Sequence, residues 1–130
     1  MLPISRFNVL IIDDNPEFIK SLSRLILDVA GSNLISVHST DNVYDGMAMA
    51  RDHGFQFIFL NVKMSTIDNI LIAKNVAMVN HQSTKIIAIS FHTETIFKSQ
   101  VIRAGATHYM VKDEIDHTSL NHVFTYNNIA

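Results

Sequence analysis

The stretch VLIIDDNPEF, residues 9–18, contains the end of an expected strand and the start of an expected helix, and this pattern decides the fold. Four apolar residues run into two acids, and an Asn-Pro pair follows at once. A short run rich in Ile and Val is typical of a strand that is buried on both faces. Asn15 can cap a helix, and Pro16 suits the first helical position because the N–H that proline lacks would have no partner there. The stretch therefore predicts a buried strand that ends at Asp13 and Asp14 and passes directly into a helix.

Four further apolar runs follow along the chain, and each is succeeded by a segment with helical spacing. The five expected strands span residues 9–12, 34–37, 57–60, 86–89 and about 107–111. The five expected helices span about 16–30, 42–52, 68–80, 94–104 and 116–126. Strand followed by helix, five times over, predicts an α/β fold whose five-stranded parallel sheet is connected by right-handed crossovers. The length suits one compact domain, which is expected to take up residues 1–130.

Apolar residues three or four positions apart mark the helix faces that are expected to point inward. They are Phe18, Leu22, Leu25, Ile26 and Val29 in the first helix, Ile70, Leu71, Ala73, Ala77 and Val79 in the third, and Leu120, Val123 and Phe124 in the fifth. Gly31, Gly54 and Gly105 are expected just past helix ends, where a left-handed backbone is common. Asp41 is expected to cap the second helix.

Composition narrows the class of protein. The chain is 48% apolar, its net charge is −2, and its basic residues form no cluster. Binding to a nucleic-acid backbone or an anionic membrane needs concentrated positive charge, so this domain is expected to bind neither. No apolar run is long enough for a membrane span or a signal peptide, and no cysteine is present for a disulfide or a thiolate metal site. A cytoplasmic location is therefore expected.

Polar side chains follow four of the five expected strands. Asp13 and Asp14 come after the first strand, Asn61 after the third, Ser90 after the fourth and Lys112 after the fifth. In open parallel sheets, functional groups gather at the carboxyl ends of the strands, where the strand order reverses. These five residues are therefore expected to converge on one pocket.

In these features the chain resembles the receiver domain of bacterial response regulators. The resemblance covers almost the whole chain and rests on VLIIDDNPEF, FIFLNVKMSTIDN, IIAIS and GATHYMVKD, in this order and at these strand ends. It implies a flavodoxin-like (βα)5 fold with a doubly wound sheet, and a role in two-component signalling.

The resemblance also implies roles for the converging residues. Asp13 and Asp14 would hold Mg²⁺, a hard cation that prefers oxygen ligands, and the metal would neutralise charge on an incoming phosphoryl group. Lys112 and Ser90 would contact phosphoryl oxygens. Ser90 and Tyr109 stand at the family's switch positions, where the hydroxyl moves towards the phosphate and the aromatic ring turns inward.

Two departures from the family bear on that chemistry. The phosphorylated aspartate would stand at position 61, where this chain has Asn61, and a carboxamide is a poor nucleophile without negative charge. One anionic ligand fewer should make Mg²⁺ binding weak or absent. Phe91 follows Ser90 where the family prefers a small residue, and it is expected to block the pocket. The expectation is a pseudo-receiver that works without phosphorylation and is not an enzyme.

Simpler structural roles are open for the same residues. Asp13 and Asp14 can end a strand as solvated acids, and a structural salt bridge from Lys112 to Asp14 is favoured over catalysis. Ser90 can be a small polar residue at a strand end, and Tyr109 a fixed packing residue. Phe91 can point to solvent, where it would suggest a partner-binding surface.

The seven histidines do not predict a metal site. They stand at positions 38, 53, 81, 92, 108, 117 and 122. Only the last two are close in sequence, and a five-residue step does not place two side chains on one helix face as a four-residue step does.

Three functions stay open at this point. The first is a protein-interaction module that binds another signalling protein, or itself, through the fourth helix, fifth strand and fifth helix, or through the first and fifth helices. Exposed apolar residues are expected near Ile96, Val101 and Tyr109. The second is a conventional receiver in which Asn61 replaces a native aspartate. It would be phosphorylated by a histidine kinase and would feed a DNA-binding output domain. The third is a small-molecule sensor with Phe91, Met64 and Tyr109 lining an apolar pocket.

Overall fold

Five strands and five α-helices alternate along the chain in the computed structural model, which describes residues 7–31, 35–79 and 83–126. The strands are β1 (Phe7–Ile12), β2 (Ile35–Thr40), β3 (Phe57–Asn61), β4 (Lys85–Ser90) and β5 (His108–Val111). The helices are α1 (Pro16–Ala30), α2 (Val43–Asp52), α3 (Asp68–Ala77), α4 (Thr95–Ala104) and α5 (His117–Tyr126). Two short 3₁₀ turns, η1 (Met64–Thr66) and η2 (Lys112–Glu114), follow β3 and β5.

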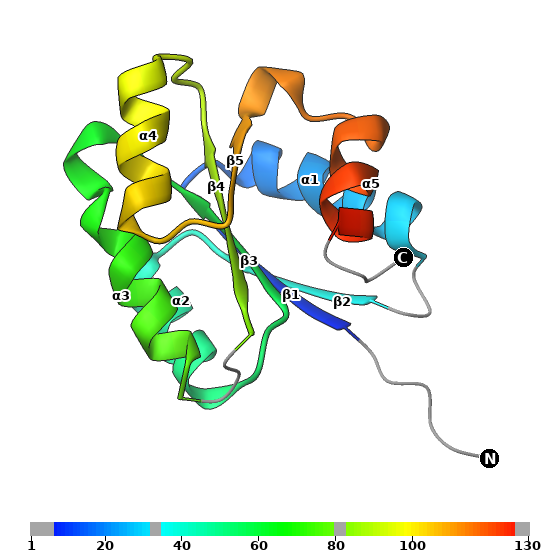
Figure 1. The fold of residues 1–130 in the computed structure, drawn as a ribbon. Helices are drawn as coiled ribbons and strands as arrows, with labels where there is room; N and C mark the ends of the chain where they lie inside the picture. Colours follow the sequence, from blue (N-terminus) through cyan, green and yellow to red (C-terminus); the bar gives the residue numbers. More distant parts are fainter. Residues whose placement is uncertain (1–6, 32–34, 80–82, 127–130) are drawn as a thin grey trace.

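All five strands form one parallel sheet in the order β2-β1-β3-β4-β5. Helices α1 and α5 cover one face of the sheet, and α2, α3 and α4 cover the other (Figure 1). The strand order reverses between β1 and β3, so the carboxyl ends of these two strands flank the point where ligand sites form in such sheets. The predicted fold class is confirmed.

The two faces of the sheet bury two separate apolar clusters. In β1, Val9 and Ile11 pack towards α1 and α5, whereas Leu10 and Ile12 pack towards the other three helices. This alternation follows from the two-residue period of a strand. It explains why β1 reads as a continuous apolar run, since both of its faces lie inside the protein.

Helix α1 begins and ends where its residues predict. The Asn15 side chain accepts a hydrogen bond from the backbone N–H of Phe18 at 3.1 Å, and Pro16 takes the first helical position. Gly31 ends the helix with φ of +86°, a conformation that costs glycine little. Of the residues predicted to face inward, Leu22 and Ile26 are buried. The cap thus sets the direction in which the chain leaves Asp13 and Asp14.

Two predicted features of the second and third helices are wrong. Asn42, not Asp41, caps α2, because its side-chain oxygen reaches the N–H groups of Tyr44 and Asp45 at 2.8 and 3.1 Å. Leu71 and Val79 are exposed rather than inward-facing. Both faces of the α3 segment are apolar, so spacing alone does not identify the buried one.

Strand and helix ends differ from prediction by one to three residues elsewhere. Strand β2 continues to Thr40, because its parallel pairing with β1 runs as far as Ile12. Residue 34 of the predicted second strand and residue 80 of the predicted third helix lie outside the described residues. Within the described part of the chain, none of the helices is both long and apolar enough to cross a membrane.

Candidate functional site

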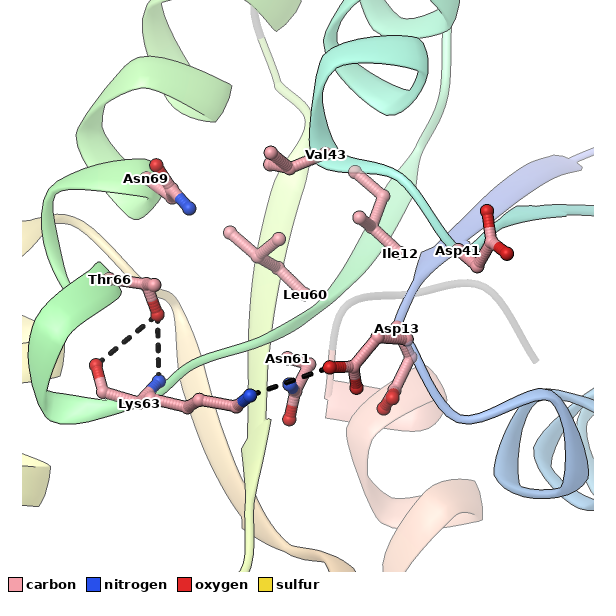
Figure 2. A pocket seen from close by; sticks show the side chains of 10 residues that line it. Ile12, Asp13, Asp41, Val43, Leu60, Asn61, Lys63, Thr66 and Asn69 are labelled. Atoms are coloured by element: carbon pink, nitrogen blue, oxygen red, sulfur yellow. Dashed lines mark hydrogen bonds and ion pairs between the residues drawn. The ribbon is translucent and has the colours of Figure 1, made fainter.

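The five residues predicted to converge all lie at the carboxyl edge of the sheet. Asp13, Ser90 and Lys112 are buried, Asn61 is partly buried and Asp14 is exposed. One cavity is lined by Asp14, Asn61, Ser90 and Lys112 together. A neighbouring cavity, towards α2, is lined by both acids and Asn61 (Figure 2). The predicted convergence is therefore found, with Asn61 on the border of both cavities.

Lys112 and Asp13 form a buried ion pair at the centre of this edge. The Lys112 Nζ atom lies 2.6 Å from Asp13 Oδ2, and the two side chains are only 4% and 0% exposed. The other carboxylate oxygen, Oδ1, accepts a hydrogen bond from the Asn15 N–H at 2.9 Å. Among the described residues, Oδ2 accepts no well-directed hydrogen bond. Its burial is therefore compensated by the charge of Lys112 rather than by a donor of good geometry.

The prediction that Lys112 forms a salt bridge with Asp14 is wrong, because Lys112 pairs with Asp13 instead. The side chain of Asp13 is fully buried, whereas the Asp14 side chain is 64% exposed. Both acids lie in the loop after β1, where Asp13 turns towards Lys112 and Asp14 towards Lys63.

Two aromatic rings enclose the Lys112 ammonium group. The Nζ atom lies 4.4 Å from the ring centroid of Phe18 and 5.1 Å from that of Phe91, within the range of cation–π attraction. Phe91 is nevertheless 57% exposed. It lines the cavity and approaches Lys112 from one side, so both predicted placements of Phe91, over the pocket and towards solvent, are partly met. The contact of Phe18 with Lys112 was not predicted from the sequence.

Lys63 was not predicted as a site residue, and it pairs with the exposed acid. Its Nζ atom lies 3.4 Å from Asp14 Oδ2, and both side chains are more than half exposed. Figure 2 shows the Lys63 side chain running past Asn61 towards the acids, with a dashed line at the ion pair. The signal in the sequence is a lysine two residues after Asn61, at a strand end that faces two acids.

These side chains do not fit a Mg²⁺ ion in the arrangement that the structure has. Both oxygens of Asp13 are engaged, Asp14 is paired with Lys63, and Asn61 contributes no charge. The two carboxylates and two ammonium groups sum to zero, whereas a hard divalent cation is held by anionic oxygens. Over the described ranges, no group of three or more His, Cys, Asp or Glu side chains is placed to hold a metal ion.

Ser90 and Tyr109 both contact the loop between β4 and α4. The Ser90 hydroxyl oxygen accepts a hydrogen bond from the His92 N–H at 3.2 Å, and the Tyr109 hydroxyl donates to the His92 carbonyl at 2.7 Å. The Phe97 ring contacts the Tyr109 ring edge-on, with centroids 5.9 Å apart. Burial raises the pKa of the Tyr109 hydroxyl, an effect that its interaction with Ser90 partly opposes. Tyr109 is thus partly buried and tied to this loop through its hydroxyl group.

The three residues expected to line an apolar pocket for a small molecule share none of the cavities described for this part of the chain. Phe91 lines the cavity beside Lys112, Tyr109 lines a different cavity between β5 and α5, and Met64 is exposed.

The prediction that Val101 is exposed is wrong, because Val101 faces the core from α4. Ile96, on the same helix, is 77% exposed as expected.

Two histidines lie near one another at the α5 side of the sheet. His108 and His122 line the cavity between β5 and α5. Burial lowers the pKa of His108 below its ordinary value of 6.5, and the neighbouring charges of His122 and Lys85 lower it further. The histidine at position 81 lies outside the described residues.

We expect the domain to lose stability as the pH falls from 6.5 through the folded-state pKa of His108. In that window the unfolded chain binds more protons than the folded chain, so acid favours unfolding. Urea unfolding at about pH 7.5 and about pH 5.5 measures the loss, and His108→Gln should reduce it. An unchanged pH dependence in this variant would contradict the assignment. Replacing His122 by Gln should raise the pKa of His108 in an NMR titration.

The family model for the response regulator receiver domain matches residues 9–124 of the chain. Among curated proteins, the Response regulator GacA of Pseudomonas viridiflava is 26% identical over 104 residues. The Signal transduction histidine-protein kinase BarA of Escherichia coli K12 is 26% identical over 105 residues. Each match covers 80% of this chain, but only 47% of GacA and 11% of BarA. The chain thus spans less than half the length of these relatives.

A solved structure with the same fold is that of the chemotaxis protein CheY4 of Vibrio cholerae. It superposes with a TM-score of 0.76, and the match covers 97% of this chain and 100% of CheY4. Only 20% of the residues are identical, so this similarity supports the arrangement of strands and helices rather than a shared activity.

Proposed function

Because the chain belongs to the response regulator receiver domain family, we propose that it acts in two-component signalling without phosphorylation at position 61. In this proposal the domain works by contact with another signalling protein or with a second copy of itself. The observation that carries it is Asn61, which lies at the carboxyl end of β3 beside Lys112 and Ser90. An amide there can neither attack a phosphoryl group as a carboxylate does nor add charge for a metal.

The ion pairs around Asn61 support the same proposal. In phosphoryl transfer to a carboxylate, a lysine must be available to the phosphoryl oxygens, and a metal must offset their charge. Here Lys112 is held by Asp13 at 2.6 Å and enclosed by Phe18 and Phe91. Each carboxylate of the acid pair is therefore already offset by an ammonium group of the protein, Asp13 by Lys112 and Asp14 by Lys63.

The surface formed by α4, β5 and α5 is our candidate for the contact with a partner. Ile96 projects from α4 into solvent, and contact with a partner at this surface would bury its apolar side chain. Lys98 lies over the Tyr109 ring at 5.7 Å and borders the cavity next to α5. The α1 and α5 surface is the alternative from the sequence. A histidine kinase is a partner only if the domain accepts a phosphoryl group.

The position of Tyr109 supports a surface that does not depend on phosphorylation. Its hydroxyl is bonded to the His92 carbonyl, and its ring packs on Phe97. The hydroxyl and the ring therefore both have partners within the domain. In this proposal, the surface around Tyr109 keeps one shape because no phosphoryl group is accepted at position 61.

Intact-mass measurement in Mg²⁺, with and without acetyl phosphate, tests the proposal. We expect the protein to gain no phosphoryl group, and a phosphorylated natural chain would overturn the proposal. Asn61→Asp is the matched variant. An adduct on this variant alone would mean that the acceptor is the only missing part. No adduct on either protein would mean that the pocket around position 61 is altered as well.

A further inference from the structure

The acid pair at the end of β1 is matched by a pair of lysines from two other strand ends. Lys112 follows β5 and neutralises the buried Asp13, and Lys63 follows β3 and approaches the exposed Asp14. Each acid thus has its own ammonium group. The Lys112 pair is buried and shields Asp13 from solvent, so Asp14 is the member of the acid pair that a dissolved ion can reach.

We propose that Lys63 is a tethered counter-ion that takes the place of a divalent cation at Asp14. This inference rests on the proposed function, because a domain that accepts no phosphoryl group has no need of a metal at the acids. It makes a separate statement about metal binding, which can be measured without any phosphoryl donor.

The backbone of Lys63 is held in place by the turn that follows β3. Its N–H donates to the Thr66 hydroxyl oxygen at 2.8 Å, and its carbonyl accepts from the Thr66 N–H at 2.9 Å. The turn therefore fixes where the Lys63 side chain starts. From that point its ammonium group comes within 3.4 Å of Asp14. A charge on such a tether is always available, whereas a dissolved ion must be captured from solution.

A lysine beside Asp14 should weaken the binding of a divalent cation. The ion would be attracted by one accessible carboxylate and repelled by an ammonium group a few ångströms away. Between solvent-exposed groups, that repulsion corresponds to roughly a tenfold change in affinity after screening by salt. Removing the charge of Lys63 should therefore reveal a cation site that the natural protein keeps closed.

Titration of the whole chain with Mn²⁺ tests this inference, with the EPR signal of the free ion as the readout. Lys63→Gln removes the charge and keeps a polar side chain, and Lys63→Arg keeps the charge. Lys63→Gln combined with Asp14→Asn also removes the carboxylate. Lys63 and Asp14 are exposed, so these variants should fold, and a urea unfolding curve of each one checks this.

We expect Lys63→Gln to bind Mn²⁺ about tenfold more tightly than the natural chain. Lys63→Arg should bind like the natural chain, and the added Asp14→Asn change should abolish the gain. Equal affinity of the natural chain and Lys63→Gln would overturn the inference, as would a gain in Lys63→Arg or a gain that survives Asp14→Asn. Phosphorylation of the natural chain would overturn the proposed function and leave the Mn²⁺ comparison unaffected.

Discussion

Replacing Lys112 by methionine is expected to lower the free energy of unfolding by about 3–5 kcal/mol, because Asp13 is then buried without a counter-charge. Methionine keeps much of the length of the side chain and can still pack between the two aromatic rings. What it removes is the ammonium group 2.6 Å from Asp13 Oδ2 and its attraction to the rings of Phe18 and Phe91. Urea unfolding monitored by circular dichroism measures the loss.

The surface pair supplies a matched control for this prediction. Lys63→Met makes the same chemical change at a pair whose two side chains are more than half exposed. Exposed ion pairs contribute little because water screens them, so this variant should stay within about 1 kcal/mol of the natural chain. If the two Lys-to-Met variants lose the same stability, burial is not what makes the Lys112 pair important.

A double variant separates the ion pair from simple loss of packing. Asp13→Asn removes the buried charge, so Lys112→Met added to it no longer leaves a carboxylate uncompensated. We expect the double variant to be more stable than the Lys112→Met single variant, with a coupling of about 1–3 kcal/mol between the two positions. Additive effects would mean that the two side chains contribute independently.

This ion pair marks the limit of what the sequence can predict. The polar residues at the strand ends were placed correctly, because a parallel sheet brings those ends to one edge whatever the details of packing. Which acid would meet Lys112 could not be inferred from two adjacent aspartates. The choice depends on which way each side chain points in the loop after β1, and the residue types alone do not fix that direction.

The limits on helix prediction have a related physical cause. In α1, polar and apolar faces are distinct and Asn15 and Gly31 mark the ends, so the predicted helix matched the structure. In α3, apolar residues occur on both sides, and Leu71 was assigned to the core although it is exposed. Lys63 was missed for another reason. Its contact with Asp14 joins residues 49 positions apart, which local spacing does not relate.

Phe97→Ala is expected to lower the free energy of unfolding by about 3–5 kcal/mol, because it empties a filled position in the core beneath α4. Phe97 is buried, and it packs against the rings of His92 and Tyr109 with centroid distances of 5.0 and 5.9 Å. These contacts join α4 to the loop after β4 and to β5. The same substitution should therefore loosen the packing around the Tyr109 ring.

Hydrogen exchange of the His92 amide separates this local effect from the global loss of stability. That N–H donates to Ser90, and the carbonyl of the same residue accepts from Tyr109. Phe124→Ala is the matched control, because Phe124 is equally buried but packs on Phe57 and Phe59 at the opposite face of the sheet. At similar global stability, exchange at His92 should be faster in Phe97→Ala than in Phe124→Ala. Equal rates would mean that Phe97 stabilises the fold without holding this loop. A faster rate would place Phe97 in the support of the α4–β5–α5 surface through which we propose that the domain acts.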